Sequence, residues 1–434
     1  MLPDQIAFSP LSRRLVEANF SGGHITSDAG LLLLREVDRQ HRLTRQLAQI
    51  FPDRRDPERI QHPLPMLLAQ RIYALAAGYE DLNDHDDLRH DYALQTAVNR
   101  LQPLAGKSTL GRLEQQTNRQ AVVEAHRILW EHFIAQHDSA PAEIVLDFDA
   151  TDVPIHGHQE GRFFHGYYDH YCFLPLYVFC GRHLLVSYLR PSNIDAARHS
   201  WAILALLVKF IRRHWPDTRI VFRGDSGFCR HRMLDWCDRH QVDYVVGIAR
   251  NDRLVQAAAP AMKLVAEAAE RAGCKLAGIY RFLYRAGSWR KQRLIVSRLE
   301  HDERGANPRF IVVSRYEEDG AKQYYEDYCA RGDMENRIKD QQLDLFAGRT
   351  SSPRWWANQW RLMLSAFVYV LFERLRDHLQ HTELARASIQ TLRLKLLKIG
   401  AVVIRNSRRI RFLLSEAYPL KDLFAGLVAR LKPT

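Results

Sequence analysis

The stretch "EIVLDFDAT", residues 143–151, most constrains the fold of this 434-residue chain. It is a dense apolar run interrupted by two acids, which is typical of a buried β-strand. Asp147 and Asp149 stand two residues apart, so on a strand their side chains point to the same face. A buried carboxylate is costly unless it is paired or bound to a metal ion. The stretch therefore predicts a sheet with a polar site on one face.

The segments that follow this strand predict a mixed sheet with helices on its faces. "YCFLPLYVFC" and "HLLVSYLRP" predict a β-hairpin, with Gly181 and Arg182 as the tight connection. "HSWAILALLVKFIRRHW" and "CRHRMLDWCDRH" predict helices, and "TRIVFRGDSGF" and "DYVVGIA" predict strands. This order favours an α/β fold in which helices pack against a mixed sheet.

The flanking regions differ in character from this core. Residues 1 to about 138 predict a mostly helical region, and residues 251–272 predict an Ala-rich helix. Residues 275–316 predict three strands of an inserted antiparallel unit. The longest apolar run, "LMLSAFVYVLF" at 362–372, is shorter than the roughly 20 residues that span a bilayer. We therefore expect a buried helix there, no membrane partner and a cytoplasmic protein.

The charge of the chain points toward a polyanionic partner. The net charge is +12. Residues 275–315 hold ten Lys/Arg against three Asp/Glu, a net of +7, and residues 391–434 hold ten against two, a net of +8. Basic blocks on a folded protein most often serve nucleic acid, although a basic protein without such a partner fits the composition as well. The six cysteines form no CxxC pair, which is typical of reduced thiols.

Two further acids extend the polar site. Asp225 in "VFRGDSGF" lies where a predicted strand meets a turn, a position where a lone Asp more often caps the next helix. In "YCARGDMENRIKD", Tyr328, Arg331, Glu335 and Lys339 follow at spacings of three, four and four residues. On a helix they share one stripe, which is either a solvated face with ion pairs or a face turned toward a site.

Three carboxylates from separate elements can hold two divalent ions. Two such ions activate water and stabilise the leaving oxygen when a phosphodiester bond is cleaved. Mg²⁺ suits a carboxylate site because it prefers oxygen ligands and keeps several waters. Together with the basic blocks, the acids predict a nuclease or a transesterase that acts on DNA.

Three stretches carry a resemblance to a known family. "LDFDAT", "FRGDSGF" and "YCARGDMENRIK", in this order, resemble the signature blocks of bacterial insertion-sequence transposases of the DDE class, in the branch with a Tyr-x-x-Arg-x-x-x-Glu helix. The resemblance implies a ribonuclease H-like mixed sheet with flanking helices, a β-rich insertion, and helical N- and C-terminal regions. The 110 residues from Asp225 to Glu335, with three predicted strands, match that layout.

The resemblance also implies roles for the acids. Asp149, Asp225 and Glu335 would be the catalytic residues and would bind two Mg²⁺ ions, for which Mn²⁺ can substitute. Asp149 is preferred to Asp147 because the family pattern has Asp, one residue, then Thr, and Asp149 is followed by Ala150 and Thr151.

The same helix would supply DNA contacts. The resemblance implies that Tyr328 and Arg331 engage DNA near the transposon end. The family often places a Lys seven residues after the Glu, and that position is Gln342 here. Lys339 lies on the same face as Glu335, so either Lys339 or Gln342 takes this role.

These implications define a transposase that binds the terminal inverted repeats of its element, hydrolyses phosphodiester bonds at the ends and joins the 3′-hydroxyls to target DNA. Its partner would be double-stranded DNA, and pairing two ends implies a homodimer in the active complex. A metal-dependent nuclease of the same fold and a catalytically inactive DNA-binding regulator remain as alternatives. The expected division is 1–138 (helical, DNA-binding), 139–249 (first catalytic part), 250–318 (insertion), 319–380 (catalytic helix and final helices) and 381–434 (basic C-terminal region).

Overall fold

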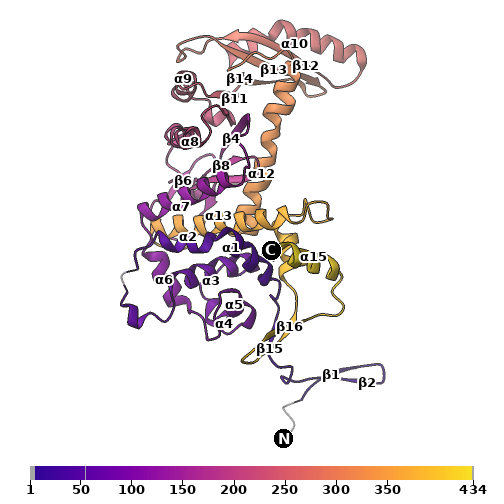
Figure 1. Cartoon of the computed structure of the whole chain (residues 1–434). Coiled ribbons are helices and arrows are strands. Elements are labelled where there is room, and N and C mark those ends of the chain that lie inside the picture. The colour runs from indigo at the N-terminus through magenta and orange to yellow at the C-terminus, as the bar shows by residue number, and fades with distance from the viewer. Residues whose placement is uncertain (1–4, 54, 433–434) are drawn as a thin grey trace. The chain divides into compact units, whose positions relative to one another are not determined.

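The computed structural model describes residues 5–53 and 55–432, and the chain forms two compact units (Figure 1). The first unit comprises Met1–Ala121, Asp340–Ala347 and Leu364–Thr434. The second comprises Val122–Lys339 and Gly348–Met363. The five-part division expected from the sequence stays a prediction.

Helices make up most of the first unit. The helix α3 is apolar on nearly all sides, and it ends at Gly78, whose left-handed backbone (φ 98°) closes the last turn. The helical elements that lie wholly in this unit are α1 (Leu31–His41), α2 (Leu43–Gln49), η1 (Pro57–Arg59), α3 (Leu64–Ala77), α4 (His85–Leu88), α5 (Tyr92–Ala97), α6 (Lys107–Gln115), η5 (Asp340–Asp344), α14 (Ile389–Leu392), η6 (Arg393–Leu397) and α15 (Lys421–Leu431).

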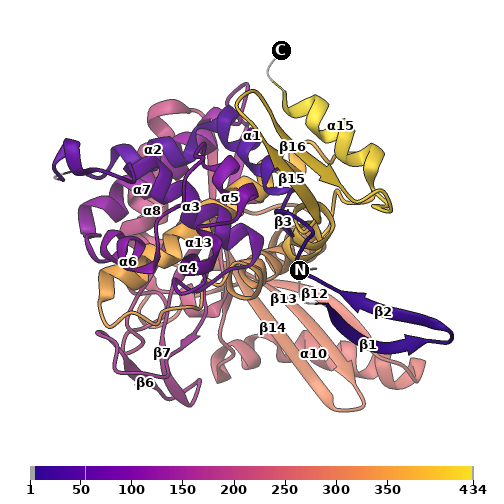
Figure 2. The same ribbon diagram turned by 90° about the horizontal axis from the view of Figure 1, so that it is seen from below.

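The first unit also contains strands that the sequence did not predict. β1 (Ile6–Leu11) and β2 (Arg14–Ala18) form an exposed antiparallel hairpin, which Figure 2 shows as a separate ribbon. β15 (Ala401–Arg405) pairs with both β16 (Ile410–Leu414) and β3 (Ile25–Thr26). The expectation of helical terminal regions is therefore incomplete. β1, β2 and β16 contain no buried residue, so they lack the burial that marks a core strand, whereas β15 buries Ala401 and Val403.

An eight-stranded mixed sheet is the centre of the second unit. β4, β10 and β11 are parallel, β8 and β9 continue the sheet antiparallel on one side, and β14, β13 and β12 continue it on the other. The strands run in the order β12-β13-β14-β11-β10-β4-β8-β9. Their bounds are β4 (Glu143–Ala150), β8 (Leu176–Cys180), β9 (His183–Tyr188), β10 (Arg219–Gly224), β11 (Asp243–Ile248), β12 (Leu276–Tyr284), β13 (Arg293–Asp302) and β14 (Gly305–Val313).

Helices cover one face of this sheet and create the main core. α8 (Ser200–His214) buries Leu204, Leu207, Val208 and Ile211, the spacing of one apolar helix face. The cluster also includes residues of α7 (Arg119–Ala135), of α9 (His231–Arg239), and Leu146, Phe148 and Phe222 of the strands. This face of the sheet is therefore apolar, as a packed core requires.

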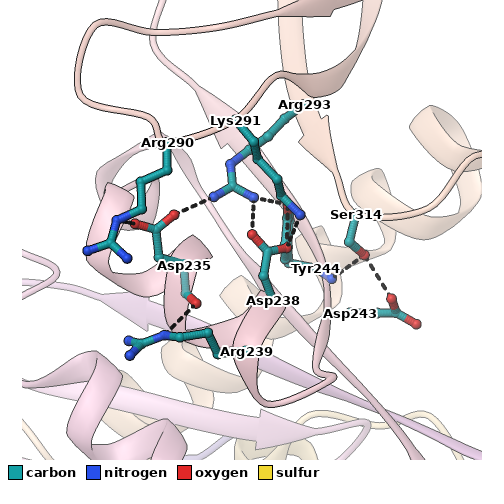
Figure 3. Close-up of polar contacts among 9 residues, drawn as sticks. All are labelled: Asp235, Asp238, Arg239, Asp243, Tyr244, Arg290, Lys291, Arg293 and Ser314. Carbon is teal, nitrogen blue, oxygen red and sulfur yellow. Dashed lines mark hydrogen bonds and ion pairs between the residues drawn. The ribbon is translucent and has the colours of Figure 1, made fainter.

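The inserted strands extend the central sheet. All three form as predicted, but β14 pairs with β11, so they are not a separate sheet. The helix α10 (Asp252–Ala272) packs along them (Figure 1). Arg293 of β13, with a side chain 1% exposed, binds Asp235 at 2.7 Å and also binds Asp238 of α9 and the Tyr244 hydroxyl (Figure 3). The insertion is thus fastened to α9 and β11.

The remaining elements of the second unit are short or irregular. β5 (Val153–Pro154), β7 (His170–Phe173) and β6 (Phe163–His165) form a small sheet in that order. A helical stretch of changing pitch runs through α11 (Gly320–Lys322), the π-helix η3 (Gln323–Tyr328), the 3₁₀-helix η4 (Cys329–Arg331) and α12 (Gly332–Lys339). α13 (Trp355–Asp377) is divided between the two units at Leu364 and contains the longest apolar run, which is buried. No helix among the described residues is long and apolar enough to cross a membrane.

Candidate active site

Asp149 and Asp225 lie at the carboxyl ends of two adjacent parallel strands. Phe148 of β4 is opposite Gly224 of β10, so the residues that follow, Asp149 and Asp225, stand level. Asp225 comes directly after β10, where its Oδ1 accepts a hydrogen bond of 2.8 Å from the Gly227 N–H and caps the short helix η2 (Ser226–Phe228). The carboxyl ends of neighbouring strands are where ligand sites form in open α/β sheets.

Arg331 joins the sheet to the helix that carries the third acid. Its Nη1 donates to Asp149 Oδ2 at 3.2 Å, and its Nη2 donates to Glu335 Oε1 at 3.2 Å. Asp149 and Arg331 are largely buried, whereas the Glu335 side chain is 52% exposed. One guanidinium is thus shared by acids from β4 and α12.

The acids influence one another electrostatically. Burial raises the pKa of Asp149 to about 6, with Arg331 opposing the shift and Asp225 and Glu335 adding to it. Burial disfavours the charged form of Arg331, but Asp149, Tyr328, Asp225 and Glu335 together hold the pKa of its guanidinium above the ordinary value. All three predicted acids therefore act on the same cation.

Carboxylate oxygens are the donors that Mg²⁺ prefers. Within residues 5–53 and 55–432, no three His, Cys, Asp or Glu side chains converge tightly enough to hold a metal ion. Asp149 and Glu335 converge instead on the Arg331 guanidinium, which occupies the position of a cation between two carboxylates. The residues thus fit a divalent cation in their donor chemistry, and Arg331 is the group with which it would compete.

The stripe expected on the helix is only partly regular. The expected stripe requires a uniform α-helix, but Tyr328 ends a π-helix and Arg331 ends a 3₁₀-helix. The ion pair expected between Arg331 and Glu335, four residues further along the chain, is present. Lys339 is exposed, and the described residues offer its side chain no hydrogen bond or ion pair, while Gln342 belongs to η5 of the first unit. π-Helical turns are rare and are frequent at functional sites.

Tyr328 packs against the sheet. It is half-buried, its ring lies 5.9 Å from that of Tyr324, and it contacts a small apolar cluster on this face. A Cβ on Gly247 would lie 2.6 Å from the Tyr328 hydroxyl and 2.9 Å from the Ser226 N–H. Gly247 therefore lets the tyrosine approach the turn that carries Asp225.

Asp147, the other acid of β4, is engaged in an ion pair. Its carboxylate receives Nε and Nη2 of Arg223 from the neighbouring strand, with Nη2 at 2.7 Å from Oδ2. The Asp147 side chain is 2% exposed. Sequence reasoning missed Arg223, although the sequence signal exists: it stands two residues before Asp225, as Asp147 stands before Asp149.

Tyr168, between β6 and β7, is a second residue near the acids that was missed. Burial raises its pKa to about 12, with the charges of Asp152 and Asp149 adding to the shift. His170, in the same stretch, pairs with Asp152 at 2.8 Å. No pattern in "HGYYDHY" marks Tyr168, because the influence of the Asp149 charge on it arises only in the folded chain.

Arginines gather at one cavity of the first unit. A cavity of about 470 Å³ is lined by apolar residues of α3 and by Arg35, Arg39, Arg42 and Arg45. Asp38 within it is already bonded by Thr44 and Tyr73. Among the described residues, the guanidinium groups of Arg42 and Arg45 have no ion pair. The turn between β15 and β16 adds two exposed arginines, Arg408 and Arg409, and Arg411 of β16 is exposed next to them.

Fold and site together define an α/β protein with acids at adjacent strand ends and a helical acid that faces them. A family model described as transposase DDE domain group 1 matches residues 8–434, so the chain belongs to this family. DDE transposases generally depend on a divalent metal.

Among solved structures, the cryo-EM structure of a piggyBac transposase synaptic complex with hairpin DNA is similar, with a TM-score of 0.42 and 13% identity over 94% of this chain and 86% of that chain. The comparison with curated proteins finds no match.

Proposed function

We propose that the chain is a DNA transposase of an insertion sequence. It would bind the terminal inverted repeats, hydrolyse phosphodiester bonds at the ends and join the freed 3′-hydroxyls to target DNA. Membership of the DDE family supports the class of reaction. The observation that carries the site is the sharing of Arg331 by Asp149 and Glu335, with Asp225 level with Asp149 on the next strand.

Each site residue has a proposed task. Asp149, Asp225 and Glu335 would hold two Mg²⁺ ions, which activate water and stabilise the leaving oxygen when bound. The Gly227 N–H keeps one oxygen of Asp225 oriented. Arg331 balances the charge of Asp149 and Glu335 and would also contact a DNA phosphate, a group that a planar guanidinium binds well. Tyr328 and Lys339 are the further proposed DNA contacts.

The core of the second unit is proposed to be ribonuclease H-like. Its support is the run β9-β8-β4-β10-β11, in which a hairpin flanks three parallel strands and the first two of these carry the acids. The β-rich insertion that the family layout requires corresponds to β12, β13 and β14, which lie between Asp225 and Glu335 in the chain.

The first unit is the proposed region for binding the DNA ends. Arg42 and Arg45, which are exposed and line the arginine-containing cavity, would contact phosphates, and the β15–β16 turn would add backbone contacts. Contacts of this kind position a protein on DNA and make its affinity depend on salt. Because two ends must be paired before joining, a homodimer is proposed for the active complex.

The reaction is tested with labelled DNA that carries the repeats bordering the element, together with a target plasmid and Mg²⁺. We expect cleaved ends and joined products from the wild type, and neither product when the metal is chelated. Cleavage without joining would replace the proposal with a nuclease. Binding without either reaction would replace it with a regulator.

Binding by the first unit is tested separately through salt dependence. Arg45→Ala should reduce the slope of log affinity against log salt by about 1, the effect of one lost phosphate contact. Arg119→Ala, an exposed arginine of the same unit outside the cavity, is the control and should leave the slope unchanged. Equal effects from both variants would contradict the assignment of the cavity.

A further inference from the structure

A buried ion pair lies directly beneath the acids, on the same face of the sheet. Asp147 of β4 is opposite Arg223 of β10, and both side chains point to the face that carries Asp149. The Asp147 and Arg223 side chains are 2% and 11% exposed. Nε and Nη2 of Arg223 bind the two oxygens of the carboxylate, which is the bidentate geometry that a guanidinium favours.

The third nitrogen donor of this guanidinium binds a residue outside the sheet. Nη1 of Arg223 donates to the backbone carbonyl of Asp327. Asp327 belongs to the π-helix η3, immediately before Tyr328 and four residues before Arg331. One side chain therefore connects β4 and β10, which lead to Asp149 and Asp225, with the segment that presents Arg331.

The contact falls where the helical segment is least regular. The chain passes from π-helix to 3₁₀-helix to α-helix between Gln323 and Lys339. Such changes of pitch leave backbone groups without their usual helical partners, so a hydrogen bond from outside can decide the local conformation. Stability alone is a weak explanation for the pair, because a buried ion pair can often be replaced by apolar residues at no net cost.

We propose that Arg223 is a positioning residue that uses Asp147 as its counter-ion to fix the backbone of η3, and thereby sets where Arg331 and Glu335 stand opposite Asp149. The consequence for catalysis rests on the proposed function, whereas the structural consequence does not. A lysine at position 223 keeps the positive charge beside Asp147. Because it has a single terminal amine, it cannot bind both the Asp147 carboxylate and the Asp327 carbonyl as the planar guanidinium does.

The chain offers a matched control on the same strand. Arg219 points to the same face of β10 as Arg223 and is also paired with acids, Glu143 at 2.9 Å and Asp243 at 3.0 Å. No hydrogen bond joins its side chain to a described residue of the 320–339 segment. Arg219→Lys therefore reproduces the chemical change of Arg223→Lys without touching η3.

The first test is hydrogen exchange of the full chain, which needs no enzymatic activity. Arg223→Lys should speed exchange in residues 327–335 by about ten- to a hundredfold, the effect of losing one hydrogen bond to a charged donor. Arg219→Lys should leave these amides unchanged. If Arg223→Lys does not fold, the apolar pair Asp147→Leu with Arg223→Met takes its place. Unchanged exchange in residues 327–335 of a folded variant would overturn the proposal.

The second test measures DNA cleavage by the same variants. With Arg223→Lys, the rate at saturating DNA should fall at least tenfold while the DNA dissociation constant stays within twofold of the wild-type value. Arg219→Lys should match the wild type in both. If the wild type itself does not cleave DNA, the proposed function fails while the exchange result still decides the positioning role. A wild-type cleavage rate from Arg223→Lys would overturn the catalytic consequence.

Discussion

The two faces of the central sheet bury different kinds of side chain, apolar on one face and charged on the other. On one face, Leu146, Phe148 and Phe222 join the apolar cluster beneath α8 and α9. On the other, Asp147 and Arg223 form a buried ion pair and Asp149 is bonded to Arg331. Successive residues of one strand thus differ in kind: one set contributes hydrophobic burial, and the alternate set carries paired charges at the candidate site. Substitutions on the apolar face should therefore lower mainly the free energy of unfolding, and substitutions on the charged face mainly the rate of DNA cleavage.

The largest effect is expected from Asp149→Asn on the polar face. The amide keeps the shape of the carboxylate but removes its charge, so we expect cleavage to fall by about 10³-fold or more, because stabilisation of the transition state by metal is worth several kcal/mol. The melting temperature should change little. A folded Asp149→Asn variant that cleaves faster than Asp147→Asn would show that the wrong acid of β4 was chosen.

A change on the apolar face should have the opposite profile. Leu207 of α8 is 1% exposed and lies in the main cluster. Leu207→Ala should lower the free energy of unfolding by about 2–5 kcal/mol, as measured by urea titration. At a temperature where the variant is folded, its cleavage rate should equal that of the wild type. A large loss of rate in the folded variant would mean that the two faces are not separate in function.

A substitution at Gly247 tests the close packing on the polar face. Gly247→Ala places a methyl group 2.6 Å from the Tyr328 hydroxyl, so we expect a loss of about 1–3 kcal/mol in unfolding free energy and slower cleavage. Adding Tyr328→Phe removes the clashing oxygen and should restore part of both. If Gly247→Ala is neutral, Tyr328 is not held where the structure places it.

The smallest effect concerns pH. His126 of α7 is buried, which lowers the pKa of its imidazole below 6.5. Its Nδ1 donates to the Val122 carbonyl at 2.8 Å, and its Nε2 accepts from the Ser187 N–H. Below pH 6.5 the imidazole of His126 is protonated in the unfolded chain but stays neutral in the folded protein. The free energy of unfolding should therefore fall as the pH drops below about 6.5, by at most about 1.4 kcal/mol per pH unit from this residue. His126→Gln should flatten the measured pH dependence; an unchanged dependence would contradict the assignment.

The central strands and the helices between them could be predicted from the sequence. The strands β4, β8, β9, β10 and β11 are short apolar runs bounded by turn residues, and α8 shows one apolar face, so local pattern and tertiary packing agree. The strands β1, β2 and β16 were missed because none of their residues is buried. β15 was missed although Ala401 and Val403 are buried, because its exposed positions Val402 and Ile404 are also apolar and hide the two-residue alternation. The alternation of apolar and polar residues is strong only where one face of a strand is buried, and β1, β2 and β16 have no buried residue.

The site could be predicted only as a set of residues. The two-residue spacing within β4 and the position of Asp225 after β10 indicated a shared polar face, and the structure places Asp149 and Asp225 level. The π-helix before Arg331 could not be foreseen, because a change of helical pitch depends on contacts such as that of Arg223 with Asp327. The influence of the Asp149 charge on Tyr168 was hidden for the same reason, since it arises from tertiary folding.

The most direct test of the account is a joining assay with Asp225→Asn. Labelled DNA that carries the ends of the element is incubated with a target plasmid, Mg²⁺ and either wild-type or variant protein, and both binding and joined product are measured. We expect the variant to bind the ends with wild-type affinity and to yield no joined product. Joining by Asp225→Asn at the wild-type rate would contradict the assignment of this face of the sheet as the active site.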